Sequence, residues 1–421
     1  MFSAEIIAVG SELLTPEKTD TNSLWLTEKL NSFGVEVMLK TIVGDDEARL
    51  EEVIRDALKR SDVVITTGGL GPTEDDITRP VAARAVGRQL VYQPELETDL
   101  RERFRLWGRE MPEINKRQAY AIDGAEVLPN PNGSAVGMML ADGRKLLIVL
   151  PGPPRELKPM FENHIAGRIA ELSGEVVVRR RVLKVSGMGE SALDELIAPL
   201  YRGFEGVQTS ILFNKSEVEV HLTAKAKTEA QATALLEDLS KRLSDVLGLS
   251  LFATNGEKLE EVVGSMLREN GKTLAVAESC TGGLIAMRLT DVPGSSAYFL
   301  EGAITYANQS KMRVLNVSEA TLAEYGAVSG ETAEEMARGI RQSAGSDYGI
   351  SVTGIAGPDG GSDDKPVGTV FIGYSDVDET RSVKFVFPGD RYLIRWRSSQ
   401  AALDYLRRRM IKRIAATLER E

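Results

Sequence analysis

The first 170 residues alternate between short apolar runs and amphipathic segments, and this alternation constrains the fold more than any other feature. Residues 62–66 and 145–150 are apolar runs typical of strands, whereas residues 24–33 have helical spacing. Such alternation predicts a parallel sheet with helices on both faces. Ligands bind these sheets beyond the carboxyl ends of the strands. Three loops with suitable chemistry are expected there, at residues 10–22, 67–79 and 151–156.

Residues 171–252 have a different pattern. Residues 217–226 alternate polar and apolar side chains, which predicts a strand with one solvated face, and residues 229–247 form an amphipathic helix. We expect a small α+β module here. Its Gly187-Met188-Gly189-Glu190 segment favours a plain turn and helix cap over a nucleotide-binding loop, because two glycines before a helix are a weak signal.

A linker is predicted at residues 248–256, followed by a second α/β region. This region should begin with a helix at residues 258–268 and end with several helices within residues 390–418. Its expected strands are residues 274–277, 297–306, 348–352, 369–374 and 384–387.

Composition excludes several classes of function. The 421 residues carry a net charge of -11, which argues against a general nucleic-acid binder. One cysteine excludes an intramolecular disulfide, and two histidines exclude the common zinc sites, so any metal should be a hard cation held by oxygen ligands. Without a signal-peptide pattern or a long apolar run, we expect a cytoplasmic protein that does not bind membranes.

Residues 277–283 read AESCTGG and place a hydroxyl and a thiol on a turn between a strand and a helix. The first amides of that helix should point at a ligand. No histidine follows His221, so a nucleophilic Ser279 would need another base, and Tyr306 and Lys311 are the candidates. Two alternatives stay open: Ser279 caps the helix, or Cys280 is the nucleophile.

Six motifs in this order resemble the CinA family (competence/damage-inducible protein A) along nearly the whole chain. They are GSELL with Asp20 and Asn22 downstream, TTGGLGPTEDDITR, LPGPPREL, AESCTGG, ITYANQSK and VTGIAGP. The resemblance implies a multi-domain α/β protein. Residues 1–170 would form a molybdopterin-binding-like α/β sandwich, residues 171–252 a KH-like α+β domain, and residues 257–421 an α/β amidohydrolase domain.

For the C-terminal domain the resemblance implies deamidation of nicotinamide mononucleotide to nicotinate mononucleotide without a cofactor. Ser279 matches the family nucleophile, and Tyr306 and Lys311 match its activating pair. Either Lys311 takes the proton with a lowered pKa, or a charged Lys311 lowers the pKa of Tyr306, which then takes it. The other residues expected at the substrate are Cys280, Thr281, Gly282 and Gly283, whose amides would bind the oxyanion, with Thr353, Gly354 and, for the phosphate, Arg391.

For the N-terminal domain the resemblance implies hydrolysis of ADP-ribose to AMP and ribose 5-phosphate with a divalent metal, Mg²⁺ or similar. Within the acidic cluster of Glu74, Asp75 and Asp76, the expected metal ligands are Asp75 and Asp76. Alternatively, Asp76, Asp20 and Asn22 only cap helices. The expected nucleotide-site residues are Glu12, Asp20, Asn22, Thr67, Gly68, Gly69, Gly71, Pro151 and Gly152.

Two other functions compete with this interpretation. The N-terminal domain could bind a pterin or nucleotide without hydrolysis, or the chain could be a competence or DNA-repair adaptor with vestigial pockets. A nucleic-acid-binding KH module needs a GXXG loop between helices. Residues 203–206 (GFEG) have that spacing, but Glu205 would face phosphate unfavourably. The partners that the resemblance implies are nicotinamide mononucleotide, ADP-ribose and a second copy of the chain in a homodimer.

Overall fold

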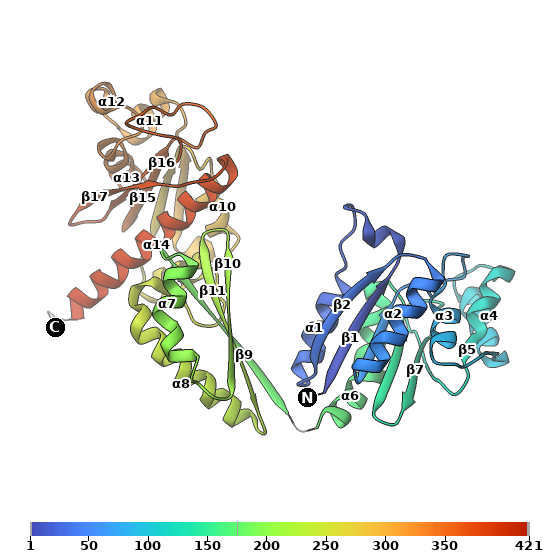
Figure 1. Ribbon diagram of the computed structural model, residues 1–421. Helices are drawn as coiled ribbons and strands as arrows, with labels where there is room; N and C mark the ends of the chain where they lie inside the picture. The colour runs from blue at the N-terminus through green and yellow to red at the C-terminus, as the bar shows by residue number, and fades with distance from the viewer. Residues whose placement is uncertain (1, 175, 419–421) are drawn as a thin grey trace. The chain divides into compact units, whose positions relative to one another are not determined.

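The computed structural model describes residues 2–174 and 176–418 (Figure 1). Residues 1, 175 and 419–421, which fall within the three predicted domains, lie outside the described residues. The chain forms two compact units. One comprises residues 1–179 and 224–234, and the other comprises residues 180–223 and 235–421.

The first unit contains a six-stranded sheet in the order β2-β1-β3-β8-β7-β6. Strands β2, β1, β3 and β8 are parallel, but β7 is antiparallel to both of its neighbours. The prediction of a parallel sheet is therefore wrong at one edge, because β7 and β8 form a tight hairpin in which Gly143 has φ +61°. The strands are β1 (Ser3–Val9), β2 (Glu36–Val43), β3 (Val63–Thr67), β6 (Glu126–Leu128), β7 (Gly137–Asp142) and β8 (Lys145–Leu150).

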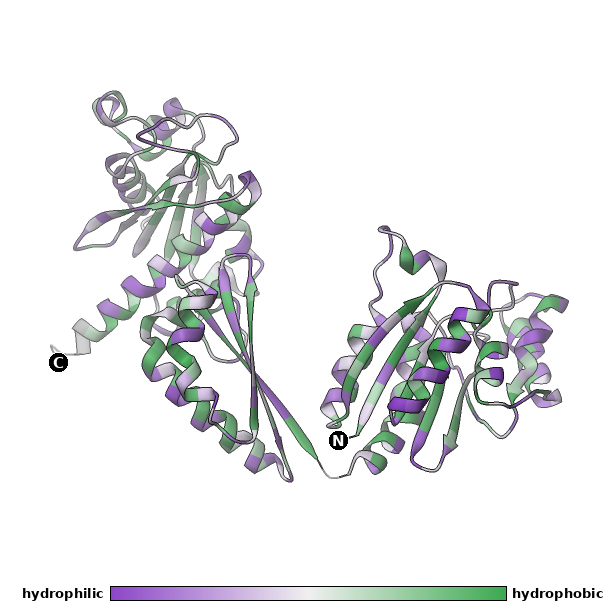
Figure 2. Cartoon of the chain, in the orientation of Figure 1, coloured by the Kyte–Doolittle hydropathy of each residue, from purple (hydrophilic) through white to green (hydrophobic). Residues whose placement is uncertain are grey.

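The remaining elements of this unit cover the sheet and extend beside it. They are η1 (Ser11–Leu14), α1 (Asn22–Ser32), α2 (Glu47–Arg60), α3 (Thr78–Ala85), α4 (Pro94–Leu106), η2 (Glu113–Ala119), α5 (Pro154–Met160), η3 (Phe161–Ile165) and α6 (Ala166–Ser173), with the paired strands β4 (Leu90–Tyr92) and β5 (Tyr120–Ile122). In Figure 2 the central strands are mainly hydrophobic, whereas α2 and α4 carry many hydrophilic residues.

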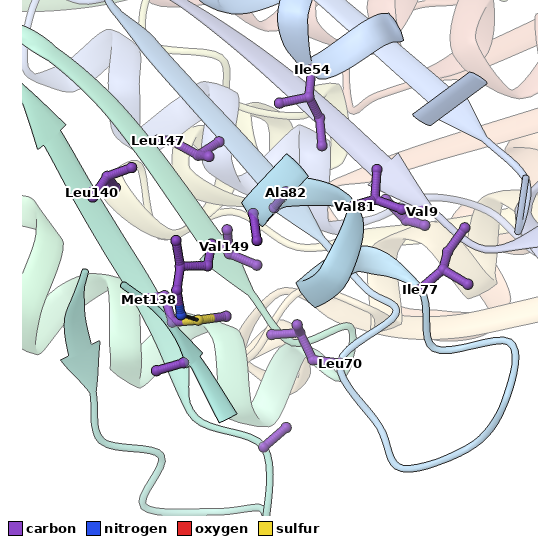
Figure 3. Packing of buried hydrophobic residues seen from close by; sticks show 14 of the residues in the cluster. Val9, Ile54, Leu70, Ile77, Val81, Ala82, Met138, Leu140, Leu147 and Val149 are labelled. Carbon is purple, nitrogen blue, oxygen red and sulfur yellow. Dashed lines mark hydrogen bonds between the residues drawn. The ribbon is translucent and has the colours of Figure 1, made fainter. Parts of the chain in front are cut away.

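Both faces of this sheet are buried, as the sequence predicts. Along β1, Ile7 and Val9 enter one hydrophobic cluster, while Ala4 and Ile6 enter another on the opposite face. Figure 3 shows the first cluster, in which side chains from β7 and β8 pack against Ile54 of α2 and the residues of α3. The carboxyl ends of β1, β3 and β8 therefore meet at one rigid edge.

The middle module is a four-stranded sheet with two helices, and its strand order is β10-β11-β9-β12. Strand β11 alternates buried and half-buried residues as predicted. The predicted linker is partly wrong, because its residues 248–253 form η4 and β12, and β12 pairs with β9. The elements are β9 (Val177–Ser186), α7 (Glu190–Tyr201), β10 (Val207–Asn214), β11 (Glu217–Ala226), α8 (Glu229–Leu247), η4 (Gly248–Ser250) and β12 (Leu251–Ala253).

The C-terminal domain has a five-stranded sheet in the order β14-β13-β15-β16-β17. Strand β13 is parallel to β14 and β15, and β16 is antiparallel to β15 and β17. The elements are α9 (Leu259–Glu269), β13 (Leu274–Glu278), α10 (Leu284–Thr290), η5 (Ser295–Ala297), β14 (Phe299–Ile304), α11 (Asn308–Leu315), α12 (Glu319–Tyr325), α13 (Gly330–Ala344), β15 (Tyr348–Gly354), β16 (Thr369–Ser375), β17 (Thr380–Val386) and α14 (Arg391–Leu418).

Helices cover both faces of this sheet as well. Leu274 and Val276 of β13 pack in a cluster with α9 and α14, whereas Ala275 and Ala277 pack in a cluster with α13. The several closing helices predicted from the sequence are one continuous helix, α14. Even this long helix carries many charges, and within the described residues no helix is long and apolar enough to span a membrane.

Candidate active site

The AESCTGG segment forms a tight turn at the edge of the C-terminal sheet. Strand β13 ends at Glu278, and α10 begins at Leu284. Gly282 and Gly283 have φ values of +59° and +91°, so the turn needs glycine at both positions. Ser279 donates its amide to the Val352 carbonyl at 3.0 Å and is 9% exposed. The turn therefore holds the Ser279 hydroxyl at the carboxyl end of the strands.

The side chain of Lys311 reaches Ser279 from α11, which follows the neighbouring strand β14. Its Nζ lies 3.1 Å from Ser279 Oγ, 2.8 Å from the Thr305 carbonyl oxygen and 3.2 Å from the Tyr306 carbonyl oxygen. Lys311 is 1% exposed, and no carboxylate pairs with it within the described chain. Ser279 does not cap α10, whose N-cap is Gly283 without a side-chain cap.

Burial lowers the pKa of Lys311, and a weaker interaction with Cys280 opposes this shift. A neutral amine in this position can donate its two N–H groups to the two carbonyl oxygens. Its lone pair then points at the Ser279 hydroxyl and can accept the proton. The arrangement is that of a serine nucleophile with a lysine base.

The Tyr306 phenol lies elsewhere. Its side chain is 61% exposed, and its hydroxyl accepts a hydrogen bond from Arg391 Nη2 at 3.1 Å. Across the described residues it has no hydrogen bond with Ser279 or Lys311, so the expected activating pair is not formed. Tyr306 contacts Lys311 only through its main-chain carbonyl. Its phenol and Arg391 instead form an exposed polar pair.

Cys280 is poorly suited as the rival nucleophile. The residue is buried, and desolvation raises the pKa of its thiol to about 12. A thiolate, the reactive species, is therefore scarce at neutral pH. Cys280 packs in the hydrophobic cluster beneath the turn.

The main-chain amides of the turn divide into two groups. Gly283, Ile285 and Ala286 donate to the carboxylate of Glu278 at 3.0, 3.2 and 2.9 Å. Gly282 donates to the Ser279 carbonyl at 3.1 Å. The expectation that Gly282 and Gly283 bind the oxyanion is therefore wrong in this arrangement. Among the described residues, no oxygen accepts from the amides of Cys280 and Thr281, so these amides are the candidates for an oxyanion hole.

The other residues predicted at the substrate lie around this turn with their polar groups partly engaged. Arg391 donates to the Gly357 carbonyl at 2.8 Å. The hydroxyl proton of Thr353 is donated to the Ala327 carbonyl at 2.6 Å, so Thr353 holds a neighbouring loop. A side chain at Gly354 would lie 2.8 Å from the Thr369 carbonyl oxygen, so this position serves close packing.

Two site residues escaped the sequence analysis. Glu278 is 1% exposed, and its carboxylate accepts hydrogen bonds from the amides at the start of α10. Arg395 donates to the Thr281 carbonyl at 2.7 Å and so orients the turn. The spacing of Arg391 and Arg395, four residues apart on one helix, was a usable signal, because residues with that spacing share a helix face.

The N-terminal domain has its own cavity, of about 730 Å³, at the carboxyl edge of its sheet. Every residue predicted for the nucleotide site and the metal lines it. They are Glu12, Asp20, Asn22, Thr67, Gly68, Gly69, Gly71, Asp75, Asp76, Pro151 and Gly152. Glu74 is not among the lining residues and pairs with Arg117.

Asn22 and Asp20 support the cavity in different ways. Asn22 donates to Thr67 Oγ1 at 3.0 Å and to the Gly152 carbonyl at 2.6 Å, which joins three loops. Its Oδ1 is buried without a partner in the described chain, so it is free to accept from a ligand. Asp20 accepts from the Ser23 amide at 3.0 Å in the first turn of α1, although Thr21 is the N-cap residue, and Asp20 also lines the cavity. Asp76 instead accepts from the Thr73 amide and does not cap α3.

The charge of this cavity bears on the expected metal. Its lining residues include six carboxylates (Glu12, Asp20, Asp45, Asp75, Asp76 and Glu156) but only one lysine, Lys18. A diphosphate would be repelled there unless a cation accompanied it. However, no three carboxylate, histidine or cysteine side chains within the described residues are grouped to hold a metal. The donors suit Mg²⁺ only if phosphate and water complete its coordination.

Comparisons with known proteins agree with this layout. A family model described as "Probable molybdopterin binding domain" matches residues 5–171, "Damage-inducible protein CinA KH domain" matches 180–253, and "CinA C-terminal domain" matches 256–410. The CinA-like protein of Solibacter usitatus is 49% identical over 97% of this chain and 98% of its own length.

A putative competence-damage inducible protein of Clostridium tetani is 42% identical over 97% of this chain and 100% of its own length. A crystal structure of competence/damage inducible protein CihA from Agrobacterium tumefaciens is 38% identical, covering 35% of this chain and 91% of that chain with a TM-score of 0.35. The family matches confirm the resemblance and the three-part fold class. Matched along nearly its full length, the chain belongs to the CinA family.

Proposed function

We propose that the C-terminal domain hydrolyses a carboxamide through Ser279 and Lys311, and that its substrate is nicotinamide mononucleotide. The observation that carries the reaction type is the 3.1 Å contact between Lys311 Nζ and Ser279 Oγ, where no carboxylate among the described residues pairs with the lysine. The choice of substrate rests on the family resemblance.

In the first half-reaction, neutral Lys311 takes the hydroxyl proton of Ser279 while Ser279 Oγ bonds to the amide carbon. The amides of Cys280 and Thr281 donate to the negative oxygen of the tetrahedral intermediate. When the carbon–nitrogen bond breaks, the proton on Lys311 passes to the departing nitrogen, which leaves as ammonia. The product of this step is an ester of Ser279.

In the second half-reaction, Lys311 takes a proton from water, and the resulting hydroxide attacks the ester carbonyl. Collapse of this intermediate breaks the bond to Ser279 Oγ and returns the proton to that oxygen. Nicotinate mononucleotide is released, and Ser279 and Lys311 regain their starting states. Arg391 and Tyr306, exposed beside the site, are suited to hold the substrate phosphate.

Ammonia release from nicotinamide mononucleotide by the purified chain tests this proposal. We expect the release to persist in a chelator, since the proposed reaction uses only side chains, main-chain amides and water. Ammonia release that Ser279→Ala leaves unchanged would refute the Ser279 mechanism.

For the N-terminal domain we propose binding and hydrolysis of ADP-ribose to AMP and ribose 5-phosphate. Asp75 and Asp76 would hold a divalent cation, which when bound would neutralise the diphosphate charge. The glycine-rich loop at Gly68, Gly69 and Gly71 lets main-chain amides approach phosphates. Binding of a pterin or nucleotide without hydrolysis is the second candidate, favoured by the lack of a grouped three-ligand metal site in the described chain. Product analysis with and without Mg²⁺ separates the two.

A further inference from the structure

A second cavity of about 690 Å³ lies within the second unit, away from Ser279 and Lys311. Its lining comes from the end of β9 and the loop before α7, from β10 and the turn after it, from η4, from β17 and the segment after it, and from α14. The volume is within the range of small-molecule sites, roughly 300–1,000 Å³. Neither proposed reaction uses any residue of this cavity.

One wall of the cavity is aromatic. The rings of Phe385 and Phe387 stack with centroids 5.2 Å apart and planes 11° apart. Phe213 of β10 and Tyr405 of α14 also line the cavity, and Phe213 is half exposed. Flat aromatic side chains left open in this way favour a planar ring as the ligand.

The other wall is suited to an anion. It is formed by the loop before α7, whose Gly187, Met188 and Gly189 line the cavity. Ser186, just before this loop, is 3% exposed, and its hydroxyl has no partner in the described chain although it lines the cavity. The Ser216 hydroxyl, also in the lining, is buried without a partner too.

The side-chain charges of the cavity are positive on balance. Arg397 and Arg408 line it together with a single carboxylate, Asp404. Asp404 accepts from Arg408 Nε at 2.7 Å and from Arg407 at 2.7 Å, so its charge is already compensated. Arg397, the paired Arg408 and two unpaired buried hydroxyls, those of Ser186 and Ser216, therefore line the same space.

We propose that this cavity binds a mononucleotide, with the base against Phe385 and Phe387 and the phosphate near Ser186, Arg397 and Arg408. Stacking accounts for the aromatic wall, and a phosphate satisfies the Ser186 hydroxyl, which no residue of the described chain does. The Gly187-Met188-Gly189 segment, read as a plain turn from the sequence, is then the phosphate loop of this site. The site is independent of both proposed hydrolytic reactions.

The test is photolabelling of the full chain with 8-azido-AMP, followed by peptide mapping. Mapping separates this cavity from the other two sites, which also face nucleotides under our proposals. We expect label in peptides that contain Met188 or Phe385–Tyr405 residues, displaced by AMP at a concentration at least tenfold lower than by ribose 5-phosphate, which lacks the base.

A matched pair of glycine variants controls for folding. A Cβ atom added at Gly189, where φ is −81°, or at Gly203 meets no atom within 4 Å, so both positions can take a larger side chain. Gly189→Phe fills the cavity and should lower labelling of these peptides at least fivefold, whereas Gly203→Phe, outside the cavity, should not. Arg397→Gln should weaken AMP competition several-fold and serves if Gly189→Phe fails to fold.

Three results would overturn the proposal. The first is label confined to the N-terminal cavity or the Ser279 turn. The second is full labelling of a folded Gly189→Phe protein. The third is displacement by oligoadenylate, with a steep salt dependence, at far lower concentrations than by AMP, which would assign the surface to nucleic acid.

Discussion

Lys311 Nζ lies 3.1 Å from Ser279 Oγ, and its other contacts are main-chain carbonyls. This relationship favours Ser279 over Cys280 as the proposed nucleophile. Ser279→Ala should lower kcat for ammonia release from nicotinamide mononucleotide by about 10³-fold or more, since no other group forms the ester. Cys280→Ala should change it less than about tenfold. A reversed ranking of the two variants would assign the reaction to the thiol.

The lowered pKa of Lys311 predicts the pH dependence of the reaction. Its neutral form is the base, so kcat/KM should rise with pH and level off above the pKa of Lys311, which lies below its ordinary value of 10.5. In Lys311→Met, kcat should be about 10²- to 10⁴-fold lower, and the rise of kcat/KM with pH should disappear. Rate profiles from pH 5 to 10 check this. A profile that keeps its rise in Lys311→Met would identify a different base.

Lys311 should also make the free energy of unfolding depend on pH. Because burial lowers the pKa of Lys311 in the folded state, the unfolded chain binds more protons between that pKa and 10.5, so stability should increase with pH across this window. Lys311→Met removes the effect. The variant should be more stable than the parent at pH 7, and the difference should shrink as the pH approaches 10.5. Urea denaturation of the parent and of Lys311→Met at several pH values measures it.

The sequence could locate Ser279 and Lys311 because each follows a strand in the same sheet. Glu278 of β13 pairs with Ile304 of β14, so the two motifs must meet at one edge. The sequence pattern could not show whether the side chain of Tyr306 or that of Lys311 points into the site. Tyr306 precedes α11 and points outward, whereas Lys311 lies inside that helix and is buried. Glu278 was missed because three amides compensate its burial, and only the folded turn brings them to it.

In the N-terminal domain the sequence identified the loops and missed part of the sheet. The glycine-rich and acidic loops follow β1, β3 and β8. The alternation of strands and helices in the sequence was therefore enough to predict that these loops lie together, and they line one cavity. The antiparallel edge was overlooked although Asp142-Gly143 between two apolar runs is a hairpin signal. The GFEG segment has the spacing of a nucleic-acid clamp loop but not its position. Residues 203–206 lie between α7 and β10 and not between two helices.

Tyr306 and Arg391 should affect substrate binding and leave the chemical step intact. Tyr306→Phe removes only the hydroxyl that accepts from Arg391, so kcat should stay within about twofold and KM should rise by a factor of roughly five. Arg391→Gln removes a charged donor and should raise KM about 10- to 100-fold. Steady-state kinetics with nicotinamide mononucleotide separate the two parameters. A large kcat loss in Tyr306→Phe would return the phenol to the role of proton acceptor.

In the acidic cluster of the N-terminal domain, two neighbouring residues provide a variant and a matched control that test the expected metal site. Asp75 lines the cavity, whereas Glu74, its neighbour in sequence, lies outside and pairs with Arg117. If Asp75 helps to hold the cation that accompanies the diphosphate, Asp75→Asn should raise the Mg²⁺ concentration for half-maximal ADP-ribose cleavage by about tenfold or more. Glu74→Gln removes the same charge one residue away and should leave this concentration unchanged. Mg²⁺ titrations followed by AMP formation compare them. Equal shifts in both variants would mean that the cluster acts only through its overall charge, and the assignment of Asp75 as a ligand would fail.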